Sequence, residues 1–168
     1  KKKKFEIVLL STNKNITKII SQAKIFKVKN ILINDFDSYK KAKVKYKKLN
    51  INFFNSFDCI DLIFKKKIID YSMVSITGLD GLIPVLKLCK YSQNLAIANK
   101  ESLICGWNLI KKKLDKYKTN FIPIDSEHYS IYTLINDNSS HEIEKIYITA
   151  SGGPFLNLSK NKFNKIKI

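Results

Sequence analysis

The sequence contains no arginine, although it carries 31 basic residues and a formal net charge of +17. Every basic side chain is therefore a lysine. Arginine is the residue that forms paired hydrogen bonds to phosphates and base edges, so its absence weakens the nucleic-acid interpretation that the charge alone favours. We interpret the lysines as a solvated coat and expect no nucleic-acid partner, with a basic nucleic-acid-binding module as an alternative.

Cysteine is scarce, and its three copies stand far apart at Cys59, Cys89 and Cys105. No Cys-x-x-Cys pair is present, which excludes the common zinc and redox motifs. We expect reduced, buried thiols with a structural role.

Long apolar runs are also absent. No segment approaches the ~20 apolar residues that cross a bilayer, and the first residues, KKKKFEIVLLST, hold too short an apolar stretch for a secretory signal. We expect a soluble, intracellular protein with no membrane partner. The chain begins without methionine and enters a strand-like run almost at once, so we expect its start not to be a natural start.

Glycine is rare too, with five copies and no G-x-G-x-x-G pattern. That pattern cradles the pyrophosphate of a dinucleotide and belongs directly after the first strand of a dinucleotide-binding fold. Its absence therefore counts against a complete dinucleotide-binding fold in this chain.

What the sequence does contain is an alternation of short β-branched runs with longer segments of helical spacing. The expected strands are FEIVLL, NILIN, INFFN, YSMVSIT and NLAIAN, each followed by a predicted helix. One helical face in NITKIISQAKIFK collects Ile16, Ile19, Ile20 and Ala23. The helix in SFDCIDLIFKK is expected to open with Ser56 as its cap. The alternation predicts an α/β fold with a Rossmann-like, doubly wound parallel sheet.

Ligands of doubly wound sheets bind beyond the carboxyl ends of the strands, so the turns at residues 11–15, 77–80 and 99–102 are the places to look. From Phe121 the regular alternation of strands and helices changes. FIPI is expected to form a strand, SEHYSIYTLI a short helix and IEKIYITA a further strand. We place a domain boundary near Asn120.

An acidic pair stands out in the stretch FIPIDSEHYSIY. If the backbone is extended there, Asp125 and Glu127 lie on the same side, and a hard divalent cation such as Mg²⁺ or Mn²⁺ relieves their repulsion. The same two residues also suit a helix start, with Asp125 as the cap and Glu127 in the first turn. The spacing leaves both interpretations open. We expect His128 to be packed or capping, and His141 to be solvated.

Polar residues also occupy three turns. Lys100 in IANKES follows a strand and opens a helix, where an amine and the helix N-terminus can hold a phosphate. The turn in LLSTNKNIT offers Asn13, Lys14 and Asn15 to an adenine ribose and its 2′-phosphate. Ser151 in TASGGPF adjoins a Gly-Gly turn that suits close approach by a phosphate. Each pattern is also typical of ordinary turns, so none is decisive alone.

Taken in order, ANKES, PIDSEHYSIY and ITASGGPF closely resemble the 1-deoxy-D-xylulose 5-phosphate reductoisomerase family. The stretch FEIVLLSTNKNITKIISQ resembles the family's second strand and helix, so the resemblance covers the whole chain. It implies NADPH- and metal-dependent rearrangement and reduction of 1-deoxy-D-xylulose 5-phosphate to 2-C-methyl-D-erythritol 4-phosphate, in non-mevalonate isoprenoid biosynthesis. It also implies a homodimer in a bacterial cytoplasm or a plastid, with Mg²⁺ or Mn²⁺ as the metal.

The resemblance implies a role for each residue that meets substrate or metal. Asp125 and Glu127 would be two of three carboxylate ligands of the metal, and Glu127 would also be catalytic. Lys100 would be catalytic and would contact the sugar phosphate together with Ser126. Ser151 would bind the substrate near its phosphate.

The resemblance also implies two groups of cofactor-binding residues. Asn99 and Glu101 would line the nicotinamide side of the NADPH site. The residues flanking the 2′-phosphate end would be Asn13, Lys14 and Asn15, and the charge of Lys14 would distinguish NADPH from NADH.

Parts of the family pattern are missing from this chain. They include the glycine-rich turn upstream of Phe5, the third metal carboxylate and most phosphate contacts. We therefore expect an internal fragment with little or no turnover. Residues 1–120 would be the NADPH-binding domain without its first strand, and residues 121–168 the truncated start of an α/β catalytic domain. Another NAD(P)-binding oxidoreductase, in which the acid pair only caps a helix, is the second alternative.

Overall fold

The computed structural model describes residues 5–65, 67–137, 143–147 and 157–165 of the chain. The chain divides into two compact units, Lys1–Asp125 and Ser126–Ile168.

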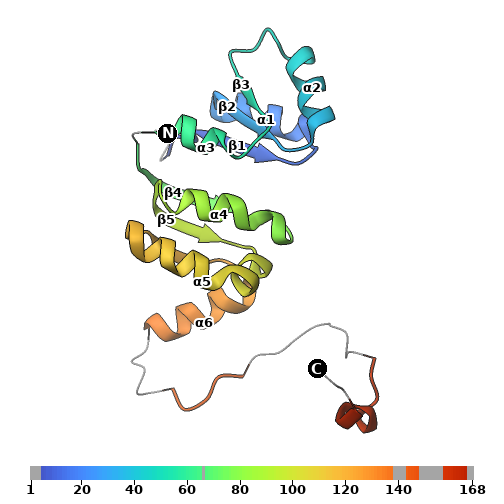
Figure 1. Ribbon diagram of the computed structural model, residues 1–168, viewed down its shortest axis with the longest axis vertical. Helices are drawn as coiled ribbons and strands as arrows, with labels where there is room; N and C mark the ends of the chain where they lie inside the picture. The colour runs from blue at the N-terminus through green and yellow to red at the C-terminus, as the bar shows by residue number, and fades with distance from the viewer. Residues whose placement is uncertain (1–4, 66, 138–142, 148–156, 166–168) are drawn as a thin grey trace. The chain divides into compact units, whose positions relative to one another are not determined.

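The first unit alternates strands with helices throughout (Figure 1). Its strands are β1 (Leu9–Thr12), β2 (Asn30–Ile33), β3 (Asn52–Phe54), β4 (Ile69–Val74), β5 (Ser92–Ile97) and β6 (Asn120–Pro123). The helices between them are α1 (Ile16–Phe26), α2 (Phe36–Lys45), α3 (Cys59–Ile63), the 3-10 helix η1 (Leu79–Gly81), α4 (Leu82–Leu88) and α5 (Lys100–Tyr117). The predicted alternation is confirmed.

The strands form two parallel, three-stranded sheets, in the orders β1-β2-β3 and β4-β5-β6. The α/β class and the parallel direction agree with the prediction. Among the described residues no ladder joins β1 to β4, so the expected sheet is present as two halves. Within the described part of the chain β1 and β4 each pair on one side only, so each has an open edge of backbone donors and acceptors.

The first half-sheet carries α1 and α2 on the same face. Ile19, Ile20 and Ala23 of α1 are buried with Ile31 and Ile33, which point to one side of β2. This is the apolar helical face predicted from the sequence. Full burial of each isoleucine side chain stabilises the fold by roughly 1.5–3 kcal/mol.

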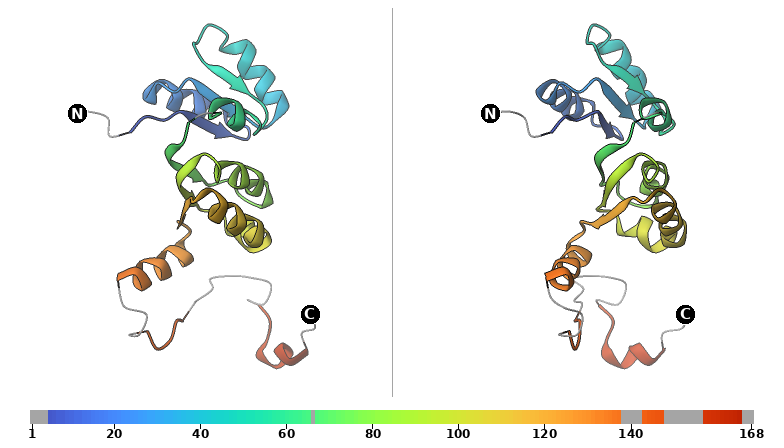
Figure 2. Two further views of the ribbon diagram at one scale, coloured as in Figure 1. Left: turned by 60° about the vertical axis from the view of Figure 1, so that its left-hand side comes forward. Right: turned by 90° about the vertical axis from the view of Figure 1, so that its left-hand side faces the viewer.

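The second half-sheet is covered by α4 and α5, which lie side by side over it (Figure 2). Leu95 and Ile97 of β5 are fully buried against this pair of helices. Gly106 lets the helices approach closely, since a Cβ there would lie 2.4 Å from Leu82 Cδ1.

The start of α3 differs from the prediction. The helix begins at Cys59, with Asp58 before it, rather than at Ser56. The Ser56 hydroxyl instead accepts a hydrogen bond from the Asp58 N–H at 3.2 Å and donates to the Asp58 carboxylate at 2.9 Å. Ser56 therefore makes a cap-like bond in the turn that precedes α3, before the helix itself begins.

A polar cluster joins α3 to the second half-sheet. Lys87 Nζ lies 2.7 Å from Asp61 Oδ2 and 2.9 Å from Asp58 Oδ1. The Tyr91 hydroxyl donates to Asp61 Oδ1 at 2.7 Å. The Tyr91 side chain also packs with Ile60 and other apolar residues of a small core. The first residues of β1 and β4 contact the same core.

The cysteines agree only in part with the expectation of buried thiols. Cys59 and Cys89 are buried, and burial raises the pKa of each thiol to about 11. Both therefore stay protonated and unreactive at neutral pH. Cys105 is exposed, because it lies on the outward-facing side of α5, as its neighbour Ile104 does.

The second unit contains the helix α6 (Ser126–Asp137) and a 3-10 helix, η3 (Lys160–Lys165). The short helix predicted for SEHYSIYTLI is confirmed. The strand predicted for residues 143–150 is not found over its described part, residues 143–147. No described strand pairs with this segment, and a lone extended segment has no ladder to stabilise it.

No helix in the described part of the chain combines the length and apolarity needed to cross a membrane.

We expect Lys87→Met to lower the thermal unfolding midpoint at pH 7 by a few degrees, because it breaks both ion pairs of the polar cluster. Hydrogen bonds from Lys87 hold the pKa values of Asp58 and Asp61 below the ordinary 3.8. The stabilisation is therefore present above that pH and is lost as the pH falls through the lowered values.

Melts followed by circular dichroism at pH 7 and pH 3 measure this effect, and the deficit of the variant should shrink at pH 3. Lys111→Met, on an exposed face of α5, serves as the control and should shift the midpoint by at most about 1 °C. A deficit of equal size at both pH values would contradict the prediction.

Candidate functional site

The turns after β1 and β2 meet at the carboxyl edge of the first half-sheet. The Asn34 N–H donates to the Thr12 carbonyl at 3.0 Å, and the Asp35 N–H donates to the Asn13 carbonyl at 3.2 Å. Asn15 caps α1 by accepting from the Lys18 N–H at 3.1 Å. The predicted residues 13–15 therefore form an exposed turn on the side of the sheet where ligands bind.

Lys14 faces a carboxylate across this edge. Its Nζ lies 3.9 Å from Asp35 Oδ2, and its side chain is 72% exposed. Hydrogen bonds from Ser38, more than the charge of Lys14, lower the pKa of Asp35. Because the ion pair is long and exposed, it is worth little, and Lys14 remains available to an incoming anion.

Asn55 stabilises the same edge and was not singled out from the sequence. Its Nδ2 donates to the Ile33 carbonyl at 2.7 Å and to the Asn34 carbonyl at 3.0 Å. This ties the end of β3 to the end of β2. The one available signal was an asparagine directly after the strand run INFF, which is also common in turns without any such bond.

At the second half-sheet, Asn99, Lys100 and Glu101 occupy the junction of β5 and α5. Asn99 is 2% exposed and caps α5, whereas Lys100 and Glu101 open the helix and are exposed. Asn99 also donates to the carbonyls of Ile76 and Gly78, which follow β4. Two of the three predicted turns are therefore joined by one side chain.

Strand register brings Asp125 to the same place. Val74, Ile97 and Pro123 are aligned across β4, β5 and β6. The Ile124 N–H still donates to the Ile97 carbonyl at 3.1 Å, and Asp125 follows it directly. Neighbouring strands lie about 4.8 Å apart, so the chain at Asp125 leaves the sheet beside Asn99, the residue before Lys100.

Ser126 and Glu127 begin the second unit, in the first turn of α6. Both are exposed, and the Ser126 hydroxyl donates to Glu127 Oε2 at 3.0 Å. Asp125 is half-buried and His128 is exposed, and each takes part in further interactions. The helical position of Glu127 suits the capping interpretation, and it leaves its carboxylate accessible to a cation.

Two predicted positions, Ser151 and His141, lie outside the described residues. Within the described part of the chain, no group of three or more His, Cys, Asp or Glu side chains is arranged to hold a metal ion. The chemistry of the Asp125 and Glu127 donor set, two carboxylates without a thiolate, nevertheless fits a hard divalent ion.

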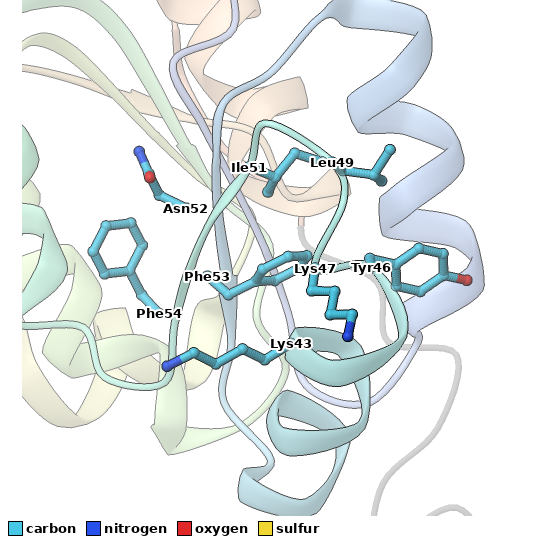
Figure 3. A pocket seen from close by; sticks show the side chains of 8 residues that line it. All are labelled: Lys43, Tyr46, Lys47, Leu49, Ile51, Asn52, Phe53 and Phe54. Atoms are coloured by element: carbon cyan, nitrogen blue, oxygen red, sulfur yellow. The ribbon is translucent and has the colours of Figure 1, made fainter.

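A cavity of about 430 Å³ lies elsewhere, between the end of α2 and β3 (Figure 3). Tyr46 and Phe53 line it, with Lys43 and Lys47 among the other lining residues. It runs along the whole of β3, because Asn52, Phe53 and Phe54 all line it. None of the predicted site residues that the structure describes contributes to this cavity.

Comparison with protein families gives two matches along the chain. A family described as 1-deoxy-D-xylulose 5-phosphate reductoisomerase matches residues 1–106, and one described as the C-terminal domain of the same enzyme matches residues 121–168. A reductoisomerase of that name from Pelagibacter ubique is 52% identical over 167 residues, and one from Clostridium novyi is 35% identical over 154 residues.

The chain spans less than half of these relatives. The matched parts cover 99% of this chain and 43% of the Pelagibacter protein, and 90% of this chain and 40% of the Clostridium protein. Solved structures of that enzyme are also matched over less than half of their length. The reductoisomerase from Zymomonas mobilis in complex with NADPH has a TM-score of 0.75 at 28% identity, covering 92% of this chain and 41% of that one.

A second structure, of DOX-P reductoisomerase with NADPH, fosmidomycin and magnesium, also has a TM-score of 0.75, at 27% identity, and covers 97% of this chain and 43% of that one. Family matches, sequence identity and fold therefore agree along the chain. It belongs to the 1-deoxy-D-xylulose 5-phosphate reductoisomerase family.

Proposed function

We propose that this chain is part of an enzyme that converts 1-deoxy-D-xylulose 5-phosphate to 2-C-methyl-D-erythritol 4-phosphate with NADPH and a divalent metal. The observation that carries the proposal is the 52% identity to a reductoisomerase over 167 residues, which includes all three motif regions. The nucleic-acid module and the unrelated oxidoreductase are not favoured by these matches. The 168-residue chain alone is proposed to turn over little or no substrate.

Residues 1–120 are proposed to be the NADPH-binding domain without its first strand and glycine-rich turn. The open edges of β1 and β4 support this assignment. One further parallel strand between them would give the order β3-β2-β1, new strand, β4-β5-β6, which is a continuous doubly wound sheet. Residues 121–168 are proposed to begin the catalytic domain, in agreement with the C-terminal family match.

NADPH is proposed to bind across the carboxyl edges of both half-sheets. The exposed turn at residues 13–15 would hold the 2′-phosphate end, with Lys14 as the counter-charge. Glu101 and the backbone of Asn99, at the start of α5, would flank the nicotinamide. The NADPH complex of the Zymomonas relative supports this cofactor.

The substrate and metal are proposed to meet near the carboxyl ends of β5 and β6, where the chain reaches Asp125. Asp125 and Glu127 would hold Mg²⁺ or Mn²⁺, which supplies Lewis-acid polarisation of the substrate's oxygens. Lys100 would contact the substrate and hold its negative charge, while the exposed hydroxyl of Ser126 would donate a hydrogen bond to it. Ser151 would bind near the phosphate.

The remaining assignments follow from the family. The enzyme is proposed to be a homodimer in a bacterial cytoplasm or a plastid, and the first of these locations is supported by the bacterial relatives.

A chimera tests the function directly. Residues 1–168 replace the matching segment of the Pelagibacter ubique relative, and NADPH oxidation is followed with 1-deoxy-D-xylulose 5-phosphate and Mg²⁺. We expect turnover that requires substrate, metal and NADPH, and none from the 168-residue chain alone. A chimera that folds but lacks turnover, beside an active unmodified relative, would contradict the proposal.

The metal role of the acidic pair predicts a large loss in that chimera. We expect Asp125→Asn and Glu127→Gln each to lower kcat by about 100-fold or more, because an amide is a much weaker ligand for Mg²⁺. Turnover at increasing Mg²⁺ concentration measures the effect. Asp115→Asn, on the exposed surface of α5, is the matched control. Unchanged metal dependence in both site variants would leave the pair as a helix cap.

Coenzyme selectivity tests Lys14. We expect Lys14→Ala to raise the KM for NADPH about tenfold while the KM for NADH stays the same, because only NADPH carries the 2′-phosphate. Steady-state kinetics of the chimera with each coenzyme give both values. Lys18→Ala, one turn further along α1, should change neither. Equal effects on the two coenzymes would reject this role.

A further inference from the structure

The carboxamide of Asn99 holds two turns together, and we call this group of contacts the Asn99 tie. Its Nδ2 donates to the carbonyls of Ile76 and Gly78, the latter at 2.6 Å. Its Oδ1 accepts from the Ser102 N–H at 2.6 Å. The first two bonds fix the chain after β4, and the third fixes the first turn of α5.

The surroundings of the tie are closely packed. A Cβ on Gly81 would lie 2.8 Å from Asn99 Nδ2 and 3.0 Å from the Ile76 carbonyl oxygen. Gly78 has a φ of +71°, a backbone conformation that residues other than glycine rarely adopt. The Ser102 hydroxyl is buried beside the tie and has no hydrogen-bond partner among the described residues. The turn after β4 therefore fits α5 closely at this point.

These contacts exhaust what the Asn99 side chain can donate. A carboxamide has two hydrogens, and both are used within the protein. The residue is 2% exposed, so a bound molecule could reach its side chain only if the tie broke. A broken tie would leave two half-buried backbone carbonyls without their donors, and carbonyls that water reaches only in part are costly to leave unbonded.

We propose that Asn99 is a positioning residue, whose buried tie sets the place of Lys100 and the turn after β4, rather than a residue that touches NADPH with its side chain. Lys100 follows Asn99 directly and is the first residue of α5. The functional part of this inference rests on the proposed role of Lys100, whereas the tie itself does not.

A plain helix cap is the competing explanation, and Asn99→Asp separates the two. Aspartate caps a helix as well as asparagine, so the bond from the Ser102 N–H is kept. It has no hydrogens for the two carbonyls, and its charge repels their oxygens. The substitution therefore breaks only the half of the tie that reaches the turn after β4.

Amide hydrogen exchange of the 168-residue chain, followed by NMR without cofactor, tests the tie. We expect Asn99→Asp to accelerate exchange at Gly81 and Leu82 on the order of tenfold to a hundredfold, while Ser102 changes by less than about threefold. Unchanged exchange at all three amides would overturn the inference. Asn15→Asp, in the cap of α1, is the control and should leave the Lys18 amide protected.

If Asn99→Asp does not fold, Gly81→Ala provides the second test. The added methyl group displaces the carboxamide of Asn99 but leaves the chemistry of that carboxamide unchanged. We therefore expect the Gly81→Ala variant to show the same faster exchange at the Leu82 amide. Normal protection in that variant would overturn the inference.

In the chimera, we expect Asn99→Asp to lower kcat about tenfold or more at a temperature where circular dichroism finds the variant fully folded. Unchanged kcat would reject the positioning role. A raised KM for NADPH with unchanged exchange would instead indicate direct contact with the cofactor. The exchange experiment needs no turnover, so an inactive chimera with a faster-exchanging turn would reject the proposed function and leave the tie intact.

Discussion

The pairing of β5 with strands on both of its sides is the constraint on which the site depends. Its alignment with β4 and β6 brings three chain segments out at one edge, at Val74, Ile97 and Pro123. The residues that follow include the turn held by Asn99, the exposed Lys100 and the half-buried Asp125. Because the backbone ladder sets this alignment, distant parts of the sequence reach one edge of the sheet.

Much of this arrangement could be predicted from the sequence, because apolar spacing reports which residues are buried. The face containing Ile19 and Ala23 and the strand in NLAIAN, where Leu95 and Ile97 are buried, were both evident. Strand partners were not evident, since spacing does not identify neighbours across a sheet. The division into two half-sheets therefore emerged only from the ladders. The segment after residue 142 had a strand-like composition, but composition cannot supply a partner strand.

The sequence predicted which turns follow the strands, but not which residues of those turns are buried and bonded within the protein. Asn99 and Lys100 are neighbours in the sequence, yet one is buried and bonded within the protein while the other faces solvent. Asn55 binds two carbonyls at the end of β2 much as Asn99 does after β4. Whether an asparagine in a turn caps a helix or ties two turns depends on carbonyls far away in the sequence, which local patterns do not contain.

The open edges of β1 and β4 have a consequence for how the molecule assembles. Their backbone groups can be satisfied by water, by a strand inserted between them, or by another chain. The coat of lysines gives each copy a charge of +17, which opposes the third outcome. Mutual repulsion between copies therefore disfavours edge-to-edge pairing of these strands, so the same lysines that leave the surface basic also protect its open edges.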